Sequence, residues 1–313
     1  YNPCLLDIIL IAIFKMQKNL LLLTILFYLI PFFTYSITTN KWEINLLGSK
    51  LITYEDNNFG GISGITLSEN GENFTLISDK SYYFKGKIVR DNLNKIIDFE
   101  ILDQGQLFSS KKENLTGRNI DSESIVRIKG NGFYISFESN NRIMYHEDLN
   151  EPGKFLPKHP DFDKLLFNDG IEALAIKENG ELFAIPELPP KGKVRHPIYR
   201  FNNNKWSIFD EIKINQDFKV VDAEMIDDRN LITLERKFSF YDGFKIRLRR
   251  IIIEENTIIN SEILLESLPW EYYNFEGLSK WKDNNGQIYL TLISDNQFSP
   301  LLETEVKEFI LKK

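Results

Sequence analysis

The 313-residue sequence contains only one cysteine and three histidines. Cys4 lies in an N-terminal segment that we expect to be outside the folded domain, so the domain has neither a disulfide nor a thiol nucleophile. The histidines are His146, His159 and His196, and without cysteines beside them they argue against a structural zinc site.

Two kinds of catalytic motif are also missing. No P-loop or dinucleotide-binding fingerprint occurs in the sequence. Residues 60–65 look like the Gly-x-Ser-x-Gly elbow of serine hydrolases, but Ile65 stands where the second glycine belongs. Without this elbow, and with so few histidines, a Ser-His-Asp triad is not indicated.

The longest apolar run is near the N-terminus. Residues 20–33 are almost wholly apolar, follow Met16 and Lys18, and precede small residues around Ser36. This order predicts an over-extended start and a secretory signal peptide over residues 1–36, with the domain at 37–313. An uncleaved membrane anchor is the alternative. We expect a periplasmic or secreted protein.

The chain is acidic, with a formal net charge of -7 at pH 7. This balance argues against nucleic acid and anionic membrane surfaces as partners, and it is compatible with cation binding. We expect no membrane contact beyond a leader that stays uncleaved. We also expect a monomer whose partner is a small-molecule ester or phosphoester.

One pattern recurs five times: an apolar strand, a tight turn, a second apolar strand and an acidic residue. The copies span residues 61–79, 121–138, 169–187, 221–235 and 274–295. Four of them carry Asn-Gly at the turn, which favours the left-handed backbone of a two-residue hairpin. Repeats of about fifty residues are typical of a propeller with one four-stranded blade per repeat.

These repeats predict an all-β fold, a single β-propeller. Five copies favour five blades, and six remain an alternative if an eroded stretch hides another blade. The last copy is followed by too few strands to complete a blade, and residues 42–54 offer the missing one. We expect this N-terminal strand to join the last blade and close the ring, which removes exposed sheet edges.

The repeated acids predict where the chemistry lies. Glu123, Glu172, Glu224 and Glu276 stand near the starts of four copies, where the first copy has Ser63. The acids that end the copies are Asp79, Glu138, Glu187, Glu235 and Asp295, and we expect them to return to the same mouth of the channel. At ~6 Å and an effective dielectric near 20, each like-charge pair costs roughly 3 kcal/mol. The cluster therefore needs cations, bound bases or protonation.

Carboxylates in a loose ring favour calcium first, then magnesium or manganese. Two other roles stay open. The acids can pair with cations, for which Lys80, Arg142, Arg195 and Arg236 are candidates, or bind loop backbone donors at strand ends without any chemistry. Arg236 directly follows Glu235, so we expect their side chains on opposite faces of the strand unless a bulge intervenes.

Several short motifs follow one another in a characteristic order between residues 51 and 309. They are Gly60-Gly61-Ile62-Ser63-Gly64, Ser78-Asp79, Asp121-Ser122-Glu123, Gly170-Ile171-Glu172-Ala173-Leu174, Leu234-Glu235-Arg236, Asn274-Phe275-Glu276-Gly277-Leu278 and Ser294-Asp295. In this order the chain resembles the phytase-like family (esterase-like activity of phytase), propeller proteins of the bacterial envelope. Two features depart from the family pattern: Ser124 stands where a glycine or alanine is usual, and the acidic motif at residues 294–298 is shifted.

The resemblance implies a calcium-dependent hydrolase of phosphate or carboxylate esters. It implies metal ligands among the acids Asp79, Glu123, Glu138, Glu172, Glu224, Glu276 and Asp295. Glu187 or Glu235 would act as general base, and Arg236 would stabilise developing phosphate charge. Two alternatives remain: a non-catalytic envelope propeller that holds a sugar, a lipid-derived ligand or a protein, and a lactonase-like calcium hydrolase.

Overall fold

The computed structural model describes residues 41–130, 132–166, 168–214 and 217–313. The leader predicted at residues 1–36 lies outside the described residues and stays a prediction. Contacts divide the chain into two units, Tyr1–Lys41 and Trp42–Lys313, and all the described strands belong to the second. Within the described part of the chain, no helix has the length and apolar character needed to span a bilayer.

Twenty strands and two short 3-10 helices make up this second unit. In chain order they are β1 (Glu43–Leu51), β2 (Ile62–Leu67), β3 (Asn73–Ser78), β4 (Tyr82–Arg90), β5 (Ile96–Gln106), η1 (Gly117–Asn119), β6 (Ser122–Arg127), β7 (Phe133–Phe137), β8 (Arg142–His146), β9 (Lys154–Phe155), η2 (Phe162–Lys164), β10 (Ile171–Ile176), β11 (Leu182–Pro186), β12 (His196–Asn202), β13 (Lys205–Ile212), β14 (Lys219–Asp227), β15 (Asn230–Ser239), β16 (Gly243–Glu254), β17 (Thr257–Glu266), β18 (Phe275–Lys282), β19 (Ile288–Ser294) and β20 (Glu305–Lys312).

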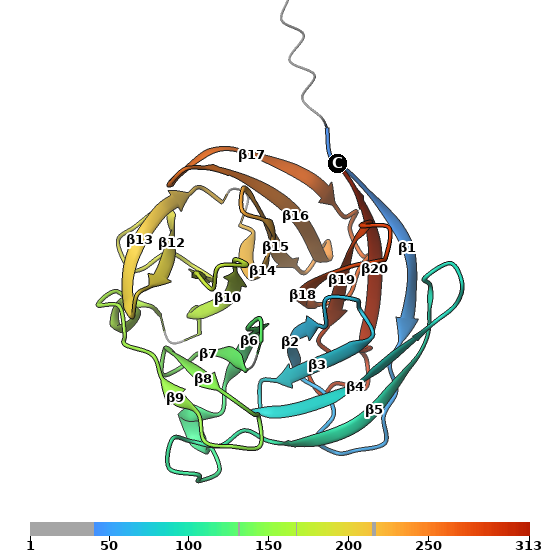
Figure 1. Cartoon of the computed structure of the whole chain (residues 1–313), viewed down its shortest axis with the longest axis horizontal. Helices are drawn as coiled ribbons and strands as arrows, with labels where there is room; N and C mark the ends of the chain where they lie inside the picture. Colours follow the sequence, from blue (N-terminus) through green and yellow to red (C-terminus); the bar gives the residue numbers. More distant parts are fainter. Residues whose placement is uncertain (1–40, 131, 167, 215–216) are drawn as a thin grey trace, which may run out of the picture. The chain divides into compact units, whose positions relative to one another are not determined.

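The strands form five antiparallel four-stranded sheets arranged as blades around an axis (Figure 1). From the axis outward, blade 1 is β2 to β5, blade 2 is β6 to β9, blade 3 is β10 to β13 and blade 4 is β14 to β17. Blade 5 is β18, β19 and β20 with β1 as its outermost strand. The fold is a five-bladed β-propeller, as the repeats predict, and the described residues contain no sixth blade.

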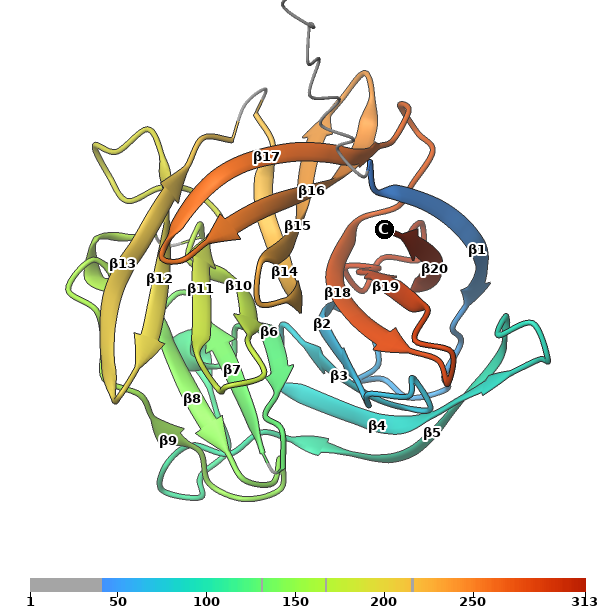
Figure 2. The ribbon, with the colours of Figure 1, turned by 45° about the horizontal axis from the view of Figure 1, so that its top comes forward.

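The N-terminal strand closes the ring. β1 pairs with β20 along its length, from Glu43 opposite Lys312 to Leu51 opposite Glu305. Figure 2 shows β1 and β20 side by side although they come from opposite ends of the domain. The strand predicted within residues 42–54 is therefore the fourth strand of blade 5, and it closes the ring.

Apolar residues fill the spaces between the blades. Each of the five buried clusters joins side chains of two adjacent blades, so every blade packs on both of its neighbours. The inner strand β2 is buried along its whole length, whereas the outer strand β17 is largely exposed. Burial on both faces explains why the inner strands have near-continuous apolar sequences.

Glycines with positive φ end the hairpins of the inner strands, as the Asn-Gly dipeptides predict. Gly71, Gly180 and Gly286 have φ of 72°, 87° and 79°. These loops are longer than the expected two residues. In the hairpin of blade 3, for example, Lys177 N–H bonds to Glu181 O across three intervening residues. A turn followed by a left-handed glycine is the usual form of such a three-residue hairpin.

Candidate functional site

A β-bulge recurs at the start of every inner strand. The register shifts between Ile62 and Gly64, Ser122 and Ile125, Ile171 and Ala173, Val220 and Asp222, and Phe275 and Gly277. The residues inside these shifts are Ser63, Glu123 with Ser124, Glu172, Val221 and Glu276. A bulge bends the strand and re-aims a side chain, which is why bulges are common beside active sites.

The ends of the second strands lie at the same level. The backbone N–H groups of Asp79, Glu138, Glu187 and Asp295 each bond to the carbonyl of the residue just before the inner strand of the same blade. In blade 4 the pair at this level is Lys219 with Arg236. Blade 4 therefore places Val221 and Arg236 where blades 2, 3 and 5 each place two acids.

Glu224 does not join the ring of first acids, contrary to the alignment of the repeats. It follows the bulged Val221 by three residues, roughly 10 Å along an extended strand. Its carboxylate accepts a hydrogen bond from Lys280 N–H at 3.2 Å and lies 3.8 Å from Lys280 Nζ. Both residues line a cavity of about 400 Å³ at the hairpin end of the inner strands. The residue of blade 4 that corresponds to Glu123 and Glu172 is the bulged Val221, so the repeat was aligned on the wrong residue.

Glu235 does not reach the mouth either. Its buried carboxylate lies 2.5 Å from Arg249 Nε and 3.4 Å from Arg247 Nη1, and it accepts a bond from Thr233. Adjacent strand residues face opposite ways, so Arg236 points into the mouth while Glu235 points into blade 4, as expected. Because two guanidinium groups contact its carboxylate, Glu235 belongs to a structural ion cluster and is a poor candidate for a general base.

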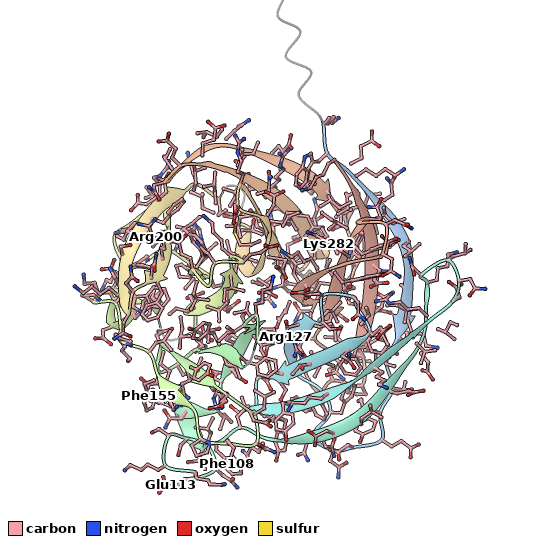
Figure 3. The ribbon with its side chains drawn as sticks, in the orientation of Figure 1. Phe108, Glu113, Arg127, Phe155, Arg200 and Lys282 are labelled. Atoms are coloured by element: carbon pink, nitrogen blue, oxygen red, sulfur yellow. The ribbon has the colours of Figure 1, made fainter. Side chains whose placement is uncertain are left out.

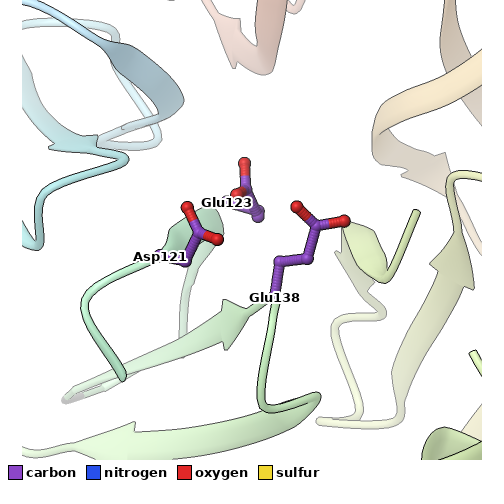
Figure 4. Close-up of side chains that lie close together, drawn as sticks. All are labelled: Asp121, Glu123 and Glu138. Carbon is purple, nitrogen blue, oxygen red and sulfur yellow. The ribbon is translucent and has the colours of Figure 1, made fainter. Parts of the chain in front are cut away.

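Asp121, Glu123 and Glu138 form a compact carboxylate cluster in blade 2 (Figure 4). One oxygen of each lies within 4.8 Å of the others, which is close enough to share a metal ion. Ser139 Oγ donates to Asp121 at 2.7 Å, and Gly170 N–H donates to Glu138 at 2.7 Å. Asp121 opens the second repeat and is not among the predicted ligands. Its position at the opposite end of that repeat from Glu138 could have indicated that the two acids meet.

The carboxylates of the mouth disfavour one another's ionisation. Burial, and then the charges of Glu138 and Asp121, raise the pKa of Glu123 well above its usual range. Burial raises the pKa of Glu138 to about 7. For Glu172, burial and the neighbouring Glu187 and Glu123 raise the pKa well above the ordinary value. A cation held among these groups would offset both the cost of burying the carboxylates and the repulsion between them.

A second corner of the mouth holds Asp79 and Asp295. Burial, with Glu276 next, raises the pKa of Asp295 to about 8. Burial raises the pKa of Asp79 to about 6, and its buried Oδ1 has no hydrogen-bond partner among the described residues. Beside it, Lys80 Nζ lies 3.1 Å from the centre of the Phe298 ring. Asp79 thus offers an unused oxygen at the edge of the acidic group.

Blade 4 brings cations to the opposite wall. Arg236 donates to Glu276 and Glu187, the latter at 3.2 Å. Lys219 Nζ lies 2.7 Å from oxygens of both Glu187 and Asp169. Burial lowers the pKa of Arg236, but the carboxylates Glu276, Glu172 and Glu187 outweigh it and raise the pKa. Lys219 and Asp169 were not predicted as site residues.

Glu187 has a pKa suited to proton transfer. Burial raises it, and the bonds from Lys219 and the charge of Arg236 lower it, leaving the pKa at about 7. A carboxylate that titrates near neutral pH can both accept and return a proton. The mouth therefore combines a carboxylate cluster, two cations and a candidate base.

The inner strands approach one another closely at the next level below the mouth. Gly64 and Gly277 occupy this level, where an added Cβ would lie 3.1 Å from Glu123 O and 2.7 Å from Ile293 respectively. Asp222 stands there in blade 4, and it accepts a hydrogen bond from Ser124 of blade 2 at 2.9 Å. This pair separates the acidic mouth from the cavity that contains Glu224.

The chain matches one family model and is similar to several solved structures. A family model described as phytase-like, esterase-like activity of phytase, matches residues 57–298. A search of curated proteins gives no match. Among solved structures, the PQQ-bound aldose sugar dehydrogenase from Streptomyces coelicolor is similar at 10% identity and a TM-score of 0.49, covering 87% of this chain and 99% of that one.

Two further solved structures are similar at the same identity of 10%. Virginiamycin B lyase from Staphylococcus aureus has a TM-score of 0.43, and a protein of unknown function from Dyadobacter fermentans DSM 18053 has one of 0.45. Each match covers 86% of this chain and 99% of the other. At these values the structural matches carry no argument about the chemistry of this chain.

Proposed function

Because the chain belongs to the phytase-like family (esterase-like activity of phytase), we propose that it is a metal-dependent hydrolase of phosphate or carboxylate esters. Calcium is the expected ion, with magnesium or manganese as the alternatives. The observation that carries the proposal is the cluster of Asp121, Glu123 and Glu138, whose oxygens lie within 4.8 Å of one another.

The donor set fits a hard divalent cation. All three residues offer carboxylate oxygens, the ligands that calcium prefers. Glu172 lies near the cluster, since the charge of Glu123 helps to raise its pKa, and Asp79 adds a buried oxygen with no partner among the described residues. We assign Asp121, Glu123 and Glu138 to the ion, with Glu172 and Asp79 as its nearest further candidates. When bound, such an ion polarises the ester oxygen and acidifies a water molecule.

The chain's own residues supply the rest of the reaction. Lys219 is half-exposed at the mouth, and Arg236 lies beside it, so an anionic oxygen of the substrate can bind between them. Glu187 touches both cations and has a pKa of about 7, which suits it to take the proton of an attacking water. The hydrogen-bonded pair of Ser124 and Asp222 confines the substrate to the mouth.

Turnover of four substrates by the purified protein tests this function: p-nitrophenyl phosphate, phytate, p-nitrophenyl acetate and a lactone. Each is assayed with calcium, with magnesium and after chelation. We expect ester hydrolysis that needs the metal, is lost in Glu123→Gln and is retained in Glu224→Gln. Turnover of the lactone alone would instead favour a lactonase. A folded protein that binds calcium but hydrolyses nothing would favour a binding propeller.

We also propose a periplasmic or secreted location for a monomeric protein, on the basis of the apolar run at residues 20–33 and the acidic balance. Fractionation of expressing cells, with mass spectrometry of the mature N-terminus, tests the location and the cleavage together. Recovery of the uncleaved chain in the cytoplasm would contradict it.

A further inference from the structure

Four exposed aromatic side chains gather at the mouth end of blade 4. Phe238, Phe240 and Tyr241 lie at the β15–β16 hairpin and are 61%, 84% and 87% exposed, and Trp270, from the loop before β18, is 69% exposed. We call these four residues the aromatic rim. In Figure 2 the hairpin tip and this loop stand next to each other at the upper edge. Exposed apolar groups gathered in this way mark interaction sites.

Trp270 is held in place although its ring is exposed. Its N–H bonds to Asp242 O and its indole Nε1 bonds to Tyr241 O, both at 2.9 Å. The ring lies over Gly243, where an added Cβ would come within 2.5 Å of it. Its backbone has a φ of 61°, a left-handed conformation that is strained for a non-glycine residue. Such strain persists where the surroundings fix it, so the indole is presented in one orientation.

The other members of the rim are also held by ring contacts. Phe238 packs on Phe244 with ring centres 4.8 Å apart, and Phe240 meets Tyr241 edge-on at 5.8 Å. Nearby charges are paired: Lys237 lies 3.9 Å from Asp217, and Lys245 lies 3.2 Å from Glu266. The carboxylates of Asp242 and Glu271, which lie next to the rim in the chain, accept hydrogen bonds from Ser239 Oγ and Leu268 N–H. The rings of the rim therefore present a preordered apolar surface.

The rim continues the wall of the acidic mouth. Phe238 follows Arg236 by two residues on β15, so both side chains face the same way, about 7 Å apart along the strand. Arg236 touches Glu187 and Glu276 inside the mouth. The hairpin extends past the start of β14, since Lys219 already pairs with Arg236 and the residues beyond pair only with β16.

We propose that the aromatic rim binds an alkyl or aryl group of the substrate while the ester lies at the carboxylate cluster. This inference rests on the proposed function and narrows it: the substrate is an anionic or acyl ester with an apolar body. Aromatic faces bind such a body through burial and ring contacts, and binding pockets commonly pair apolar walls with a few polar groups. A polyanion such as phytate would leave the rim unused.

Calorimetry with methyl phosphate and octyl phosphate tests the rim in a Glu187→Gln background, which lacks the candidate base and so suppresses turnover. It is run in the presence of calcium and below the micelle concentration of octyl phosphate. We expect octyl phosphate to bind at least tenfold tighter than methyl phosphate. The double variant Phe240→Ser/Tyr241→Ser should lose this difference and keep the affinity for methyl phosphate. The control is Phe155→Ser, an exposed phenylalanine on β9 in blade 2 that should change neither affinity (Figure 3).

Equal affinities for the two phosphates, or an equal loss in Phe155→Ser, would overturn the inference. So would a dimer in sedimentation velocity that the rim variant converts to a monomer, since the rim would then join two copies of the chain. If octyl phosphate binds through the rim and no ester is hydrolysed, the hydrolase proposal fails, and the rim remains a binding site for apolar groups. If esters are hydrolysed with no dependence on chain length and no chain-length effect on binding, only the rim fails.

An apolar ester can come from solution or from a bilayer. Pelleting with phosphatidylcholine vesicles, with and without phosphatidic acid, separates these sources. Binding that requires phosphatidic acid and is lost in Phe240→Ser/Tyr241→Ser assigns a lipid source. Tight binding of octyl phosphate without vesicle binding assigns a soluble ester.

Discussion

Ser124 of blade 2 donates a hydrogen bond of 2.9 Å to Asp222 of blade 4, a blade that is not its neighbour in the ring. The carboxylate of Asp222 also accepts a bond of 2.6 Å from Leu278 N–H in blade 5. One buried carboxylate thus ties three blades together at the centre of the channel. Because glycine or alanine stands at this level in the other blades, the pair fits between closely spaced strands.

Removing this carboxylate should destabilise the fold more than removing its partner. Asp222→Ala leaves Leu278 N–H, Ala223 N–H and the Ser124 hydroxyl without their acceptor, and we expect a loss of roughly 3 kcal/mol or more. Ser124→Ala removes one hydroxyl, which also accepts a bond from Leu174 N–H, and should cost about 1–2 kcal/mol. Urea unfolding of both variants measures the difference. Equal losses would mean that Asp222 does not tie the blades together.

The fold followed from the sequence because its repeats are local and regular. Five copies of strand, turn, strand and acid predict five blades, and apolar inner strands follow from burial on both faces. The closing strand was predictable because the last repeat lacked one. Glu123, Glu172 and Glu276 were placed correctly, since each occupies the bulge of its inner strand.

The fourth repeat is misaligned in the sequence analysis because the acids Glu224 and Glu235 lie close to positions at which blade 4 has no acid. Glu224 looked equivalent to Glu172, and Glu235 to Glu187, whereas Val221 and Arg236 hold those positions. Spacing could have revealed the shift: 15 residues separate Glu123 from Glu138 and Glu172 from Glu187, as they do Val221 from Arg236, but only 11 separate Glu224 from Glu235. The replacement of two acids by Val221 and Arg236 becomes plain only from the pairing of β14 with β15.

Glu172 and Glu224 form a matched pair for calcium binding. Glu172 lies among the carboxylates of the mouth, while Glu224 lies at the other end of the inner strands beside Lys280. We expect Glu172→Gln to weaken calcium binding at least tenfold, or about 1.4 kcal/mol, and Glu224→Gln to leave it unchanged. Isothermal titration with calcium measures both. An equal effect of the two changes would place the ion away from the mouth.

Substitutions of Glu187 and Glu235 should have opposite effects: the first should lower activity and the second should lower stability. Glu187→Gln removes the candidate base and should lower kcat by about 10²- to 10⁴-fold. Its stability loss should be small, since the change also relieves repulsion with Glu172. Glu235→Gln weakens a buried acceptor of Arg247 and Arg249 and should cost roughly 3–5 kcal/mol, with kcat kept in the folded fraction.

Steady-state kinetics measures kcat of both variants, and urea unfolding measures their free energies of unfolding. Loss of kcat in Glu235→Gln at full stability would move the base to blade 4 and away from the mouth. Full activity in Glu187→Gln would leave the proposed mechanism without its proton acceptor.

The metal-free protein should lose stability as the pH rises from 6.5 to 8.5. Burial raises the pKa of Glu138 and Glu187 to about 7 and that of Asp295 to about 8, from ordinary values near 4. Above pH 6.5 the unfolded chain has already released these protons and the folded chain still holds part of them. Unfolding therefore releases protons, and the free energy of unfolding falls by up to about 1.4 kcal/mol per pH unit for each proton released.

Calcium should flatten this slope, because a bound cation favours the ionised carboxylates in the folded state. The histidines oppose this slope near pH 6.5. Burial lowers the pKa of all three, to about 4 for His146, so near pH 6.5 the unfolded chain holds more of their protons than the folded chain does. The fall between pH 7.5 and 8.5 therefore reports the acids most directly. Urea unfolding at pH 6.5, 7.5 and 8.5, with chelator and with calcium, measures both slopes. Stability that stays level or rises with pH in the chelated protein would show that the acids of the mouth ionise without penalty, and the case for a cation among them would then rest on geometry alone.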